Sequence, residues 1–170
     1  MTTARDLLLD LYGHMEWADA AVWRTLLASD VAARDDRALA LLQHVHLVQR
    51  AFLSIWRGQP IDAHAGEGMD ARSLRSWGRD CYGEAVAEIT AASDEALAAP
   101  ARVPWTRQIA ESLGFEPAPV TVAETMLQAA WHTTHHRGQV VARLRELGVE
   151  PPLVDYIAWL WRGRPRGEWD

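Results

Sequence analysis

The sequence predicts an all-α fold, a four-helix bundle formed by a single domain over residues 1–170. Three observations support this prediction. Apolar residues recur with a helical period in four long segments, no segment shows a convincing strand pattern, and Gly and Pro residues mark the breaks. Amphipathic helices bury their apolar faces against one another, so the core of the bundle is the expected place for a ligand or metal site.

The first two long helices are expected over residues 3–28 and 37–58. Each presents one apolar face, which in the second helix holds Leu41, Val48, Ala51, Phe52 and Ile55. Gly58 and Pro60 end the second helix, because glycine favours helix ends and proline cannot continue the backbone hydrogen-bond pattern.

The third and fourth long helices are expected over residues 70–98 and 120–147, and a shorter helix near 152–162. A glycine and a Pro-Pro pair stop the fourth helix. Between the third and fourth helices, residues 100–119 form either a short hairpin or an irregular crossover. Such long crossover connections favour a helix order other than simple up-down-up-down.

Composition and charge narrow the classes of function. Hydrophobic residues make up 49% of the chain, and the formal net charge is -6 from 23 acidic and 17 basic residues. This balance argues against a nucleic-acid or membrane surface. No apolar run approaches the ~20 residues of a membrane span, and no signal-peptide pattern is visible, so we expect a soluble cytoplasmic protein. The single cysteine, Cys81, excludes an intrachain disulfide and is interpreted as inert packing.

The histidines of the fourth helix carry the most informative pattern. His132 and His136 are four residues apart, and because helical residues rotate by about 100° each, these side chains lie about 40° apart on one face. On the second helix, His44 lies within the apolar stripe. The spacing therefore favours one metal ion bound by His44, His132 and His136, with nitrogen rather than sulfur ligands.

Three other histidines are assigned different positions. His14 shares the apolar face of the first helix, where a core histidine that lines the cavity is favoured over a direct ligand. His135 lies on the outer side of the fourth helix, suited to contact a ligand residue or solvent. His64 stands among Gly and Asp residues in an expected loop and receives no role.

His46 is interpreted as a solvent-exposed residue. It points about 200° away from His44 on the second helix, on the same side as Arg50 and Arg57. A structural alternative exists for His44, His132 and His136. In it, their rings only form hydrogen bonds to Thr, Gln or carboxylate groups. One divalent cation would satisfy three acceptor nitrogens together, so the spacing favours metal binding over that alternative.

Arg137 is expected to form a buried ion pair. It projects about 140° from His132, inside the apolar arc of the fourth helix, where an unpaired guanidinium would be costly. Its candidate partners are Glu16, Asp19 and Asp155. Candidates for orienting the metal-binding rings through hydrogen bonds are Glu16, Asp19, Thr133 and Gln139.

Nine tryptophans are many for this length, and most are expected in the core. Trp159 and Trp161 in the last helix are candidates to cap the metal cavity or to form a dimer contact, since large aromatic side chains are favoured in both settings.

Three motifs, taken together, resemble those of the DinB/YfiT-like superfamily in order and spacing, over nearly the whole chain. They are HMEWAD at 14–19, LLQHVHLVQRAFL at 41–53 with WRG at 56–58, and HxxxHRGQ at 132–139 with LRxxGxxPPxxDY at 144–156. One departure is that His44 and His46 stand two apart where the family pattern needs one ligand. The helical rotation and the distance to Phe52 both select His44.

The resemblance implies a DinB/YfiT-like four-helix bundle, a divalent metal site at His44, His132 and His136, and frequent homodimers. It also implies relatives that act as thiol-dependent transferases or isomerases. Imidazole ligands suit several divalent ions, and we expect zinc or nickel.

The expected function is a metal-dependent enzyme, a thiol-dependent transferase or a hydrolase that acts on small electrophiles. Cys81 has no neighbouring histidine, so the thiol is expected from a low-molecular-weight cosubstrate. A non-catalytic metal-binding stress-response protein is the alternative, and a bundle with purely structural histidines is a third possibility. No carboxylate lies beside the three histidines by helical spacing, so no general base is predicted.

Overall fold

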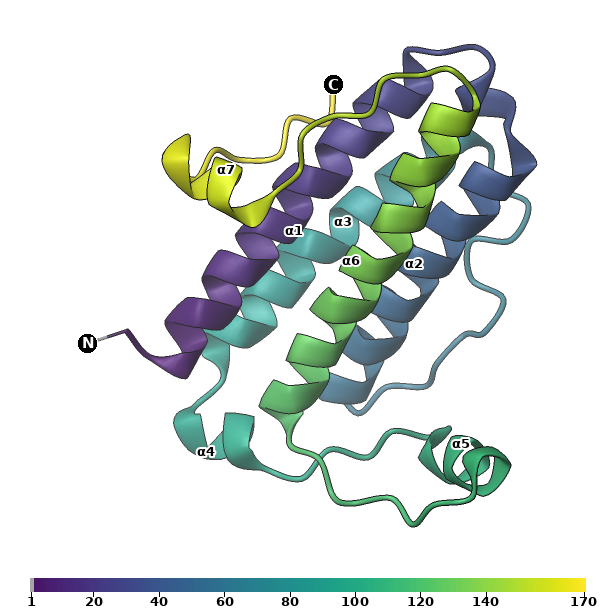
Figure 1. Cartoon of the computed structure of the whole chain (residues 1–170). Coiled ribbons are helices and arrows are strands. Elements are labelled where there is room, and N and C mark those ends of the chain that lie inside the picture. The colour runs from purple at the N-terminus through teal and green to yellow at the C-terminus, as the bar shows by residue number, and fades with distance from the viewer. Residues whose placement is uncertain (1) are drawn as a thin grey trace.

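The structure, a computed structural model, describes residues 2–170 and is built of helices (Figure 1). The four long helices are α1 (Ala4–Leu27), α2 (Asp36–Trp56), α3 (Ala71–Ala91) and α6 (Val122–Glu146). The shorter elements are the 3-10 turn η1 (Ala32–Arg34) and the helices α4 (Asp94–Ala98), α5 (Thr106–Leu113) and α7 (Tyr156–Trp161). The predicted all-α bundle with a short C-terminal helix is confirmed.

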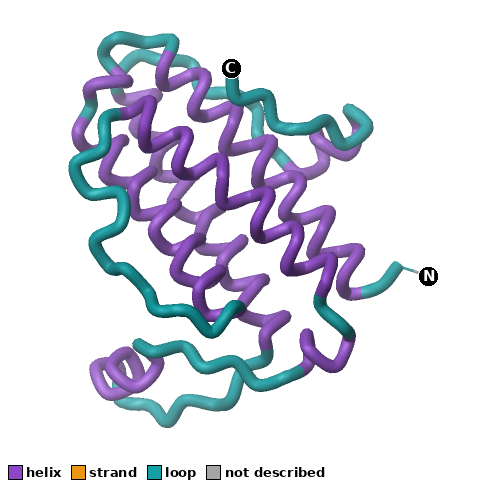
Figure 2. The backbone as a smooth tube through the Cα atoms, turned by 180° about the vertical axis from the view of Figure 1, so that it is seen from behind, coloured by secondary structure: helices purple, strands orange, loops and turns teal. Residues whose placement is uncertain are grey.

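The four long helices run in the order up-down-down-up. Helices α1 and α6 point one way, and α2 and α3 point the other way (Figure 1). The contacts agree with this order, because Arg50 of α2 reaches Trp77 of α3, while Arg57, directly after the end of α2, reaches Glu88 farther along α3. A long connection over residues 57–70 therefore runs along the side of the bundle (Figure 2). The expected departure from simple up-down-up-down order is confirmed.

Side-chain caps define where the long helices begin. Helix α6 starts with a capping box, in which the Thr121 hydroxyl accepts from the Glu124 backbone N–H and the Glu124 carboxylate accepts from the Thr121 N–H. Asp35 and Asp70 cap α2 and α3 more simply, since their carboxylates accept from the backbone N–H groups of Ala38 and Ser73. These caps satisfy backbone donors that a helix start leaves without partners.

The third predicted helix, over 70–98, is too long. Helix α3 ends at Ala91, and Ala92 and Ser93 have extended backbone. The Ser93 hydroxyl then accepts from the Ala96 backbone N–H and starts the separate helix α4. A serine that competes for backbone hydrogen bonds favours such a break. The last predicted helix is also shorter than expected, since α7 covers only Tyr156–Trp161.

The segment between α4 and α6 is a crossover, and the hairpin alternative is wrong. Pro100 and Thr121 form an isolated antiparallel bridge, and the chain between them carries helix α5. Gly114 ends α5 with a positive φ of 74°, a conformation that suits glycine. The sequence pattern did not predict α5, because this short helix is largely exposed and buries Ala110 alone.

The bundle core lies between the inner faces of the four long helices. Its largest fully buried side chains include Tyr12, Trp23, Leu42, Ile89 and Leu144. A smaller cluster of Trp17, Ala18 and Trp159 lies where α7 packs on α1. Other tryptophans depart from the expected core positions, since Trp131 and Trp161 are exposed. Across residues 2–170, no helix combines the length and apolar character needed to cross a membrane.

Candidate metal centre

His44, His132 and His136 meet where the antiparallel helices α2 and α6 pack together. One ring nitrogen of each lies within 4.8 Å of those of the other two, and the Nε2 atoms of His44 and His132 are 3.2 Å apart. Tetrahedral coordination with Zn–N bonds of ~2.0–2.1 Å places nitrogens about 3.4 Å apart. The structure thus brings the three predicted ligands together, with the His44–His132 pair close to this spacing; we call the three residues the histidine cluster.

Gln139 orients one ring of the histidine cluster. Its side-chain oxygen lies 2.8 Å from Nδ1 of His136, and because an amide oxygen only accepts, Nδ1 carries the proton. Nε2 of His136 is then the free acceptor nitrogen. The Gln139 side-chain nitrogen lies 3.2 Å from Nε2 of the exposed His135, which places His135 on the outer side as expected.

The electrostatic environment keeps His44 and His132 neutral. Burial, followed by the neighbouring His136, His44 and His135, lowers the pKa of His132 to about 4. Burial, and then His136, also lowers the pKa of His44. Neutral imidazole is the form that binds a metal. Three imidazoles suit borderline divalent ions such as zinc or nickel, so the donor set fits the expected metal.

A cavity of about 570 Å³ opens beside His44 and His132. This volume is in the range of small-molecule pockets. Its apolar wall comes from α2 and from the crossover, with Val48, Phe52, Val103, Trp105, Ile109, Phe115 and Val120. The acidic lining residue is Glu124, whose carboxylate is held by the Thr121 backbone N–H. The crossover residues could not be assigned to the site from the sequence, because helical spacing does not show which helices a connection packs against.

His14 does not lie beside the histidine cluster, so its expected place in the same cavity is wrong. Its Nε2 is 2.8 Å from the carbonyl oxygen of Val154, and its ring packs against Tyr156 and Trp159. Helix α7 therefore covers α1, away from the metal cavity, and the expected cap by Trp159 and Trp161 is also wrong.

His46 corrects the sequence interpretation most clearly, because it is fully buried. Its Nε2 accepts a 2.9 Å hydrogen bond from Trp23 Nε1, and its Nδ1 donates over 2.9 Å to the Gln49 side-chain oxygen. Burial lowers the pKa of His46, so the ring is neutral at pH 7. A Cβ atom at Gly78 of α3 would lie 2.4 Å from Nε2 of His46. The ring thus occupies space that this glycine leaves free.

The predicted pairing of Arg137 is confirmed, with Asp19 as its partner. Nη1 of Arg137 donates to Oδ1 of Asp19 over 2.9 Å, and both side chains are buried. Tyr82 also donates to Asp19, and the Gln49 amide donates over 3.0 Å to the Thr133 hydroxyl. Thr133 and Arg137 directly follow the two cluster histidines on α6. This buried network therefore fixes the rotation of α6 that points those histidines toward α2.

Two remaining assignments agree with the structure. Cys81 is buried in the core, and burial raises the pKa of its thiol to about 12, as expected for inert packing. His64 lies in the loop before α3, exposed and bonded to Glu67.

Comparison with known proteins identifies a family. No curated protein matches the chain. The sequence profile described as the DinB family matches residues 8–167, nearly the whole chain, and this range includes the histidine cluster and the buried network. The chain therefore belongs to the DinB family.

Proposed function

We propose that this protein is a metal-dependent enzyme that transfers a small thiol to electrophilic substrates or hydrolyses them. His44, His132 and His136 hold the ion, zinc or nickel. The observation that carries the proposal is the convergence of three ring nitrogens within 4.8 Å at the wall of a cavity of about 570 Å³.

The chemistry follows from an ion held by three neutral ligands. An ion held by His44, His132 and His136 would lower the pKa of a thiol or a water molecule and would polarise an electrophile. The protein supplies the orientation, since Gln139 fixes the tautomer of His136. The apolar wall formed by Phe52 and the crossover offers a surface for the apolar part of a substrate.

The nucleophile comes from outside the chain. Cys81 is buried, with a pKa of about 12, and does not line the cavity beside the cluster. A low-molecular-weight thiol is therefore the proposed cosubstrate. In the transfer, a carbon–sulfur bond forms while the bond from that carbon to the leaving group breaks. The leaving group takes the electron pair, and the thiol proton passes to solvent. In hydrolysis, water takes the place of the thiol.

Metal binding is tested first. The full chain is stripped with a chelator, reloaded with Zn²⁺ or Ni²⁺, dialysed, and measured by elemental mass spectrometry. We expect one ion per chain, lost in His44→Ala and His136→Ala and kept in the control His64→Ala, whose ring is exposed in a loop. A wild-type chain that retains no ion would mean that the cluster is structural.

Activity is tested on the same preparations. Metal-loaded and stripped protein are mixed with cysteine or another small thiol and an activated aryl chloride, and thiol consumption is followed. A metal-dependent rate that disappears in His136→Ala supports the transferase. Stoichiometric metal with no metal-dependent rate across a broad set of thiols, electrophiles and esters would favour the non-catalytic metal-binding protein.

A further inference from the structure

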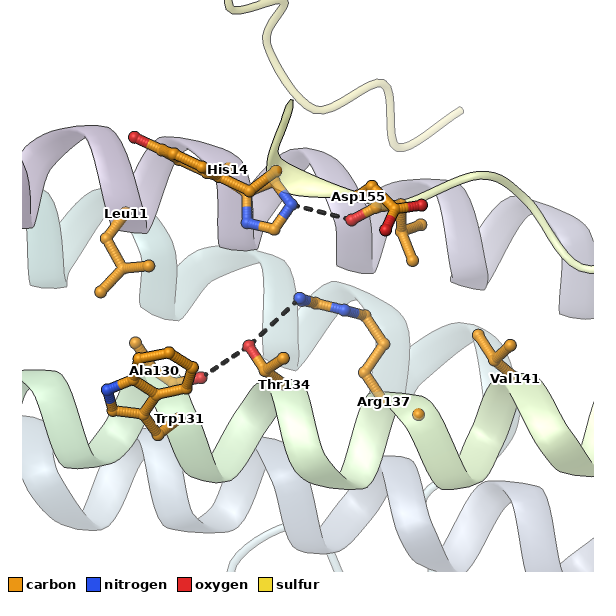
Figure 3. A pocket seen from close by; sticks show the side chains of 11 residues that line it. Leu11, His14, Ala130, Trp131, Thr134, Arg137, Val141 and Asp155 are labelled. Atoms are coloured by element: carbon orange, nitrogen blue, oxygen red, sulfur yellow. Dashed lines mark hydrogen bonds between the residues drawn. The ribbon is translucent and has the colours of Figure 1, made fainter. Parts of the chain in front are cut away.

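A second cavity, of about 510 Å³, lies on the opposite side of α6 from the histidine cluster. Thr134 and Gly138 of α6 line it, and by helical rotation of about 100° per residue they point roughly opposite to His132 and His136. Helix α1 and the segment over 154–156 form the other walls (Figure 3). The cavity is therefore separate from the proposed metal centre.

His14 supplies a hydrogen-bond acceptor to this cavity. Its side chain is 5% exposed, and Nε2 donates to the carbonyl oxygen of Val154 over 2.8 Å, because a carbonyl oxygen only accepts. Burial lowers the pKa of His14, so the ring is neutral and Nδ1 carries a lone pair. Among residues 2–170, no side chain or backbone group bonds to Nδ1.

Arg137 supplies the donors on the facing side of the cavity (Figure 3). Its Nη1 is bonded to Asp19, and its Nη2 makes only a long contact, 3.3 Å, to the Thr134 hydroxyl. A guanidinium has five N–H groups, so donors remain for a ligand. Because Asp19 offsets the charge of Arg137, the polar part of the cavity is close to neutral overall.

The remaining lining is largely apolar. Leu11, Val141 and Val154 form walls, and Trp131 and Tyr156 place exposed aromatic rings at the opening. Such a surface suits a small planar ring. An anionic ligand is disfavoured for two reasons: the lone pair of neutral His14 would face it, and the carboxylate of Asp155 lies at the rim.

We propose that this cavity binds a neutral aromatic amide or a heterocycle with the same donor and acceptor pattern. The ring packs against the apolar walls, an N–H group of the ligand donates to Nδ1 of His14, and its carbonyl oxygen accepts from Arg137. The site is independent of metal at the histidine cluster.

The test compares benzamide with benzoate, which share the ring and differ in the head group. Binding to metal-free full chain is followed by backbone amide chemical shifts in NMR. We expect benzamide to bind with a Kd of about 1 mM, as its small size allows, and benzoate to bind about tenfold more weakly, because the acceptor on His14 is left without a donor. Shifts should cluster at residues 130–141 and 154–156. Equal or tighter binding of benzoate would overturn the assignment of the ligand class.

Two variants fix the location. A Cβ atom at Gly138 meets nothing within 4 Å, so the backbone accepts a side chain there. The leucine of Gly138→Leu should occupy part of the cavity and abolish the shifts. Gly83→Leu is the matched control, since Gly83 also lies in a long helix with open space around it. His14→Phe should remove the preference for benzamide. Unchanged binding in Gly138→Leu would refute the site, as would a change of oligomeric state in that variant, which would mean that a second copy covers this face.

Discussion

The buried ion pair between Asp19 and Arg137 leads to a sharp prediction about stability. The side chains of Asp19 and Arg137 are 2% and 4% exposed, and Asp19 accepts hydrogen bonds from both Arg137 and Tyr82. Asp19→Asn keeps the shape but removes the charge that offsets the guanidinium. Loss of one partner of a buried pair typically costs about 3–5 kcal/mol. We therefore expect the free energy of unfolding of Asp19→Asn to fall by about that amount.

The assay is urea unfolding of metal-free protein followed by circular dichroism. Asp35→Asn is the matched control, because Asp35 pairs with Arg143 of the same helix α6 over 2.7 Å but at a more exposed position. Asn keeps the helix cap that Asp35 provides, so a smaller loss is expected.

The double variant Asp19→Asn/Arg137→Met separates charge from packing. Met fills part of the space of Arg137 without a charge, so the double variant should be more stable than Asp19→Asn alone. Two results would refute the reasoning. The first is a loss of unfolding free energy in Asp19→Asn no larger than that in Asp35→Asn. The second is a loss in the double variant equal to the sum of the losses in Asp19→Asn alone and Arg137→Met alone.

Four further predictions concern packing, pH, reactivity and assembly. Gly78→Ala should lower the free energy of unfolding by about 1–3 kcal/mol, because the added Cβ would lie 2.4 Å from the ring of His46. Gly83→Ala should not, since a Cβ there meets nothing within 4 Å. Chemical denaturation of both variants tests this difference. Burial lowers the pKa of His46 from 6.5, so below pH 6.5 the unfolded state binds more protons than the folded state. The free energy of unfolding should therefore fall as the pH drops, by up to about 1.4 kcal/mol per pH unit for this group. A slope below pH 6.5 that is not reduced in His46→Gln would contradict this. Cys81, with a pKa of about 12, should react with a thiol reagent only after unfolding, as a colorimetric assay in and without urea can show. The homodimer expected from the family resemblance stays a prediction. Trp161 of α7, a candidate for the dimer contact, is 80% exposed, so Trp161→Ala should shift a dimeric wild type toward monomer in sedimentation.

Helical periodicity was sufficient to predict the four long helices and the histidine cluster. His132 and His136 share a face in any helix, and the apolar stripe around His44 lies on the half-buried side of α2, which meets α6. Most fully buried residues of α2, among them Leu42, Val45 and His46, lie on the other side. The pairing of Arg137 could be predicted because a charge in an apolar arc needs a partner. These inferences depend on geometry within one helix or on a general energetic cost.

Features that depend on the placement of a second element could not be predicted. His46 lies on the side of α2 opposite to His44, yet α3 packs there, and Gly78 makes room for the ring. Helix rotation alone cannot distinguish a face covered by α3 from one covered by water. The same limit applies to His14, whose partner Val154 is distant in the sequence, and to the crossover, which folds back over the cavity.

The anchoring of the crossover has an evolutionary consequence. The two ends of the crossover are joined to each other. The Ala101 N–H donates to the Val120 carbonyl over 2.8 Å, and the Val122 N–H donates to the Ala99 carbonyl over 2.9 Å. Insertions or substitutions between these hydrogen-bonded ends can change the cavity beside the histidine cluster without changing how α2 packs against α6. Related proteins can thus differ in the ligands that the cavity accepts while the three histidines keep their positions.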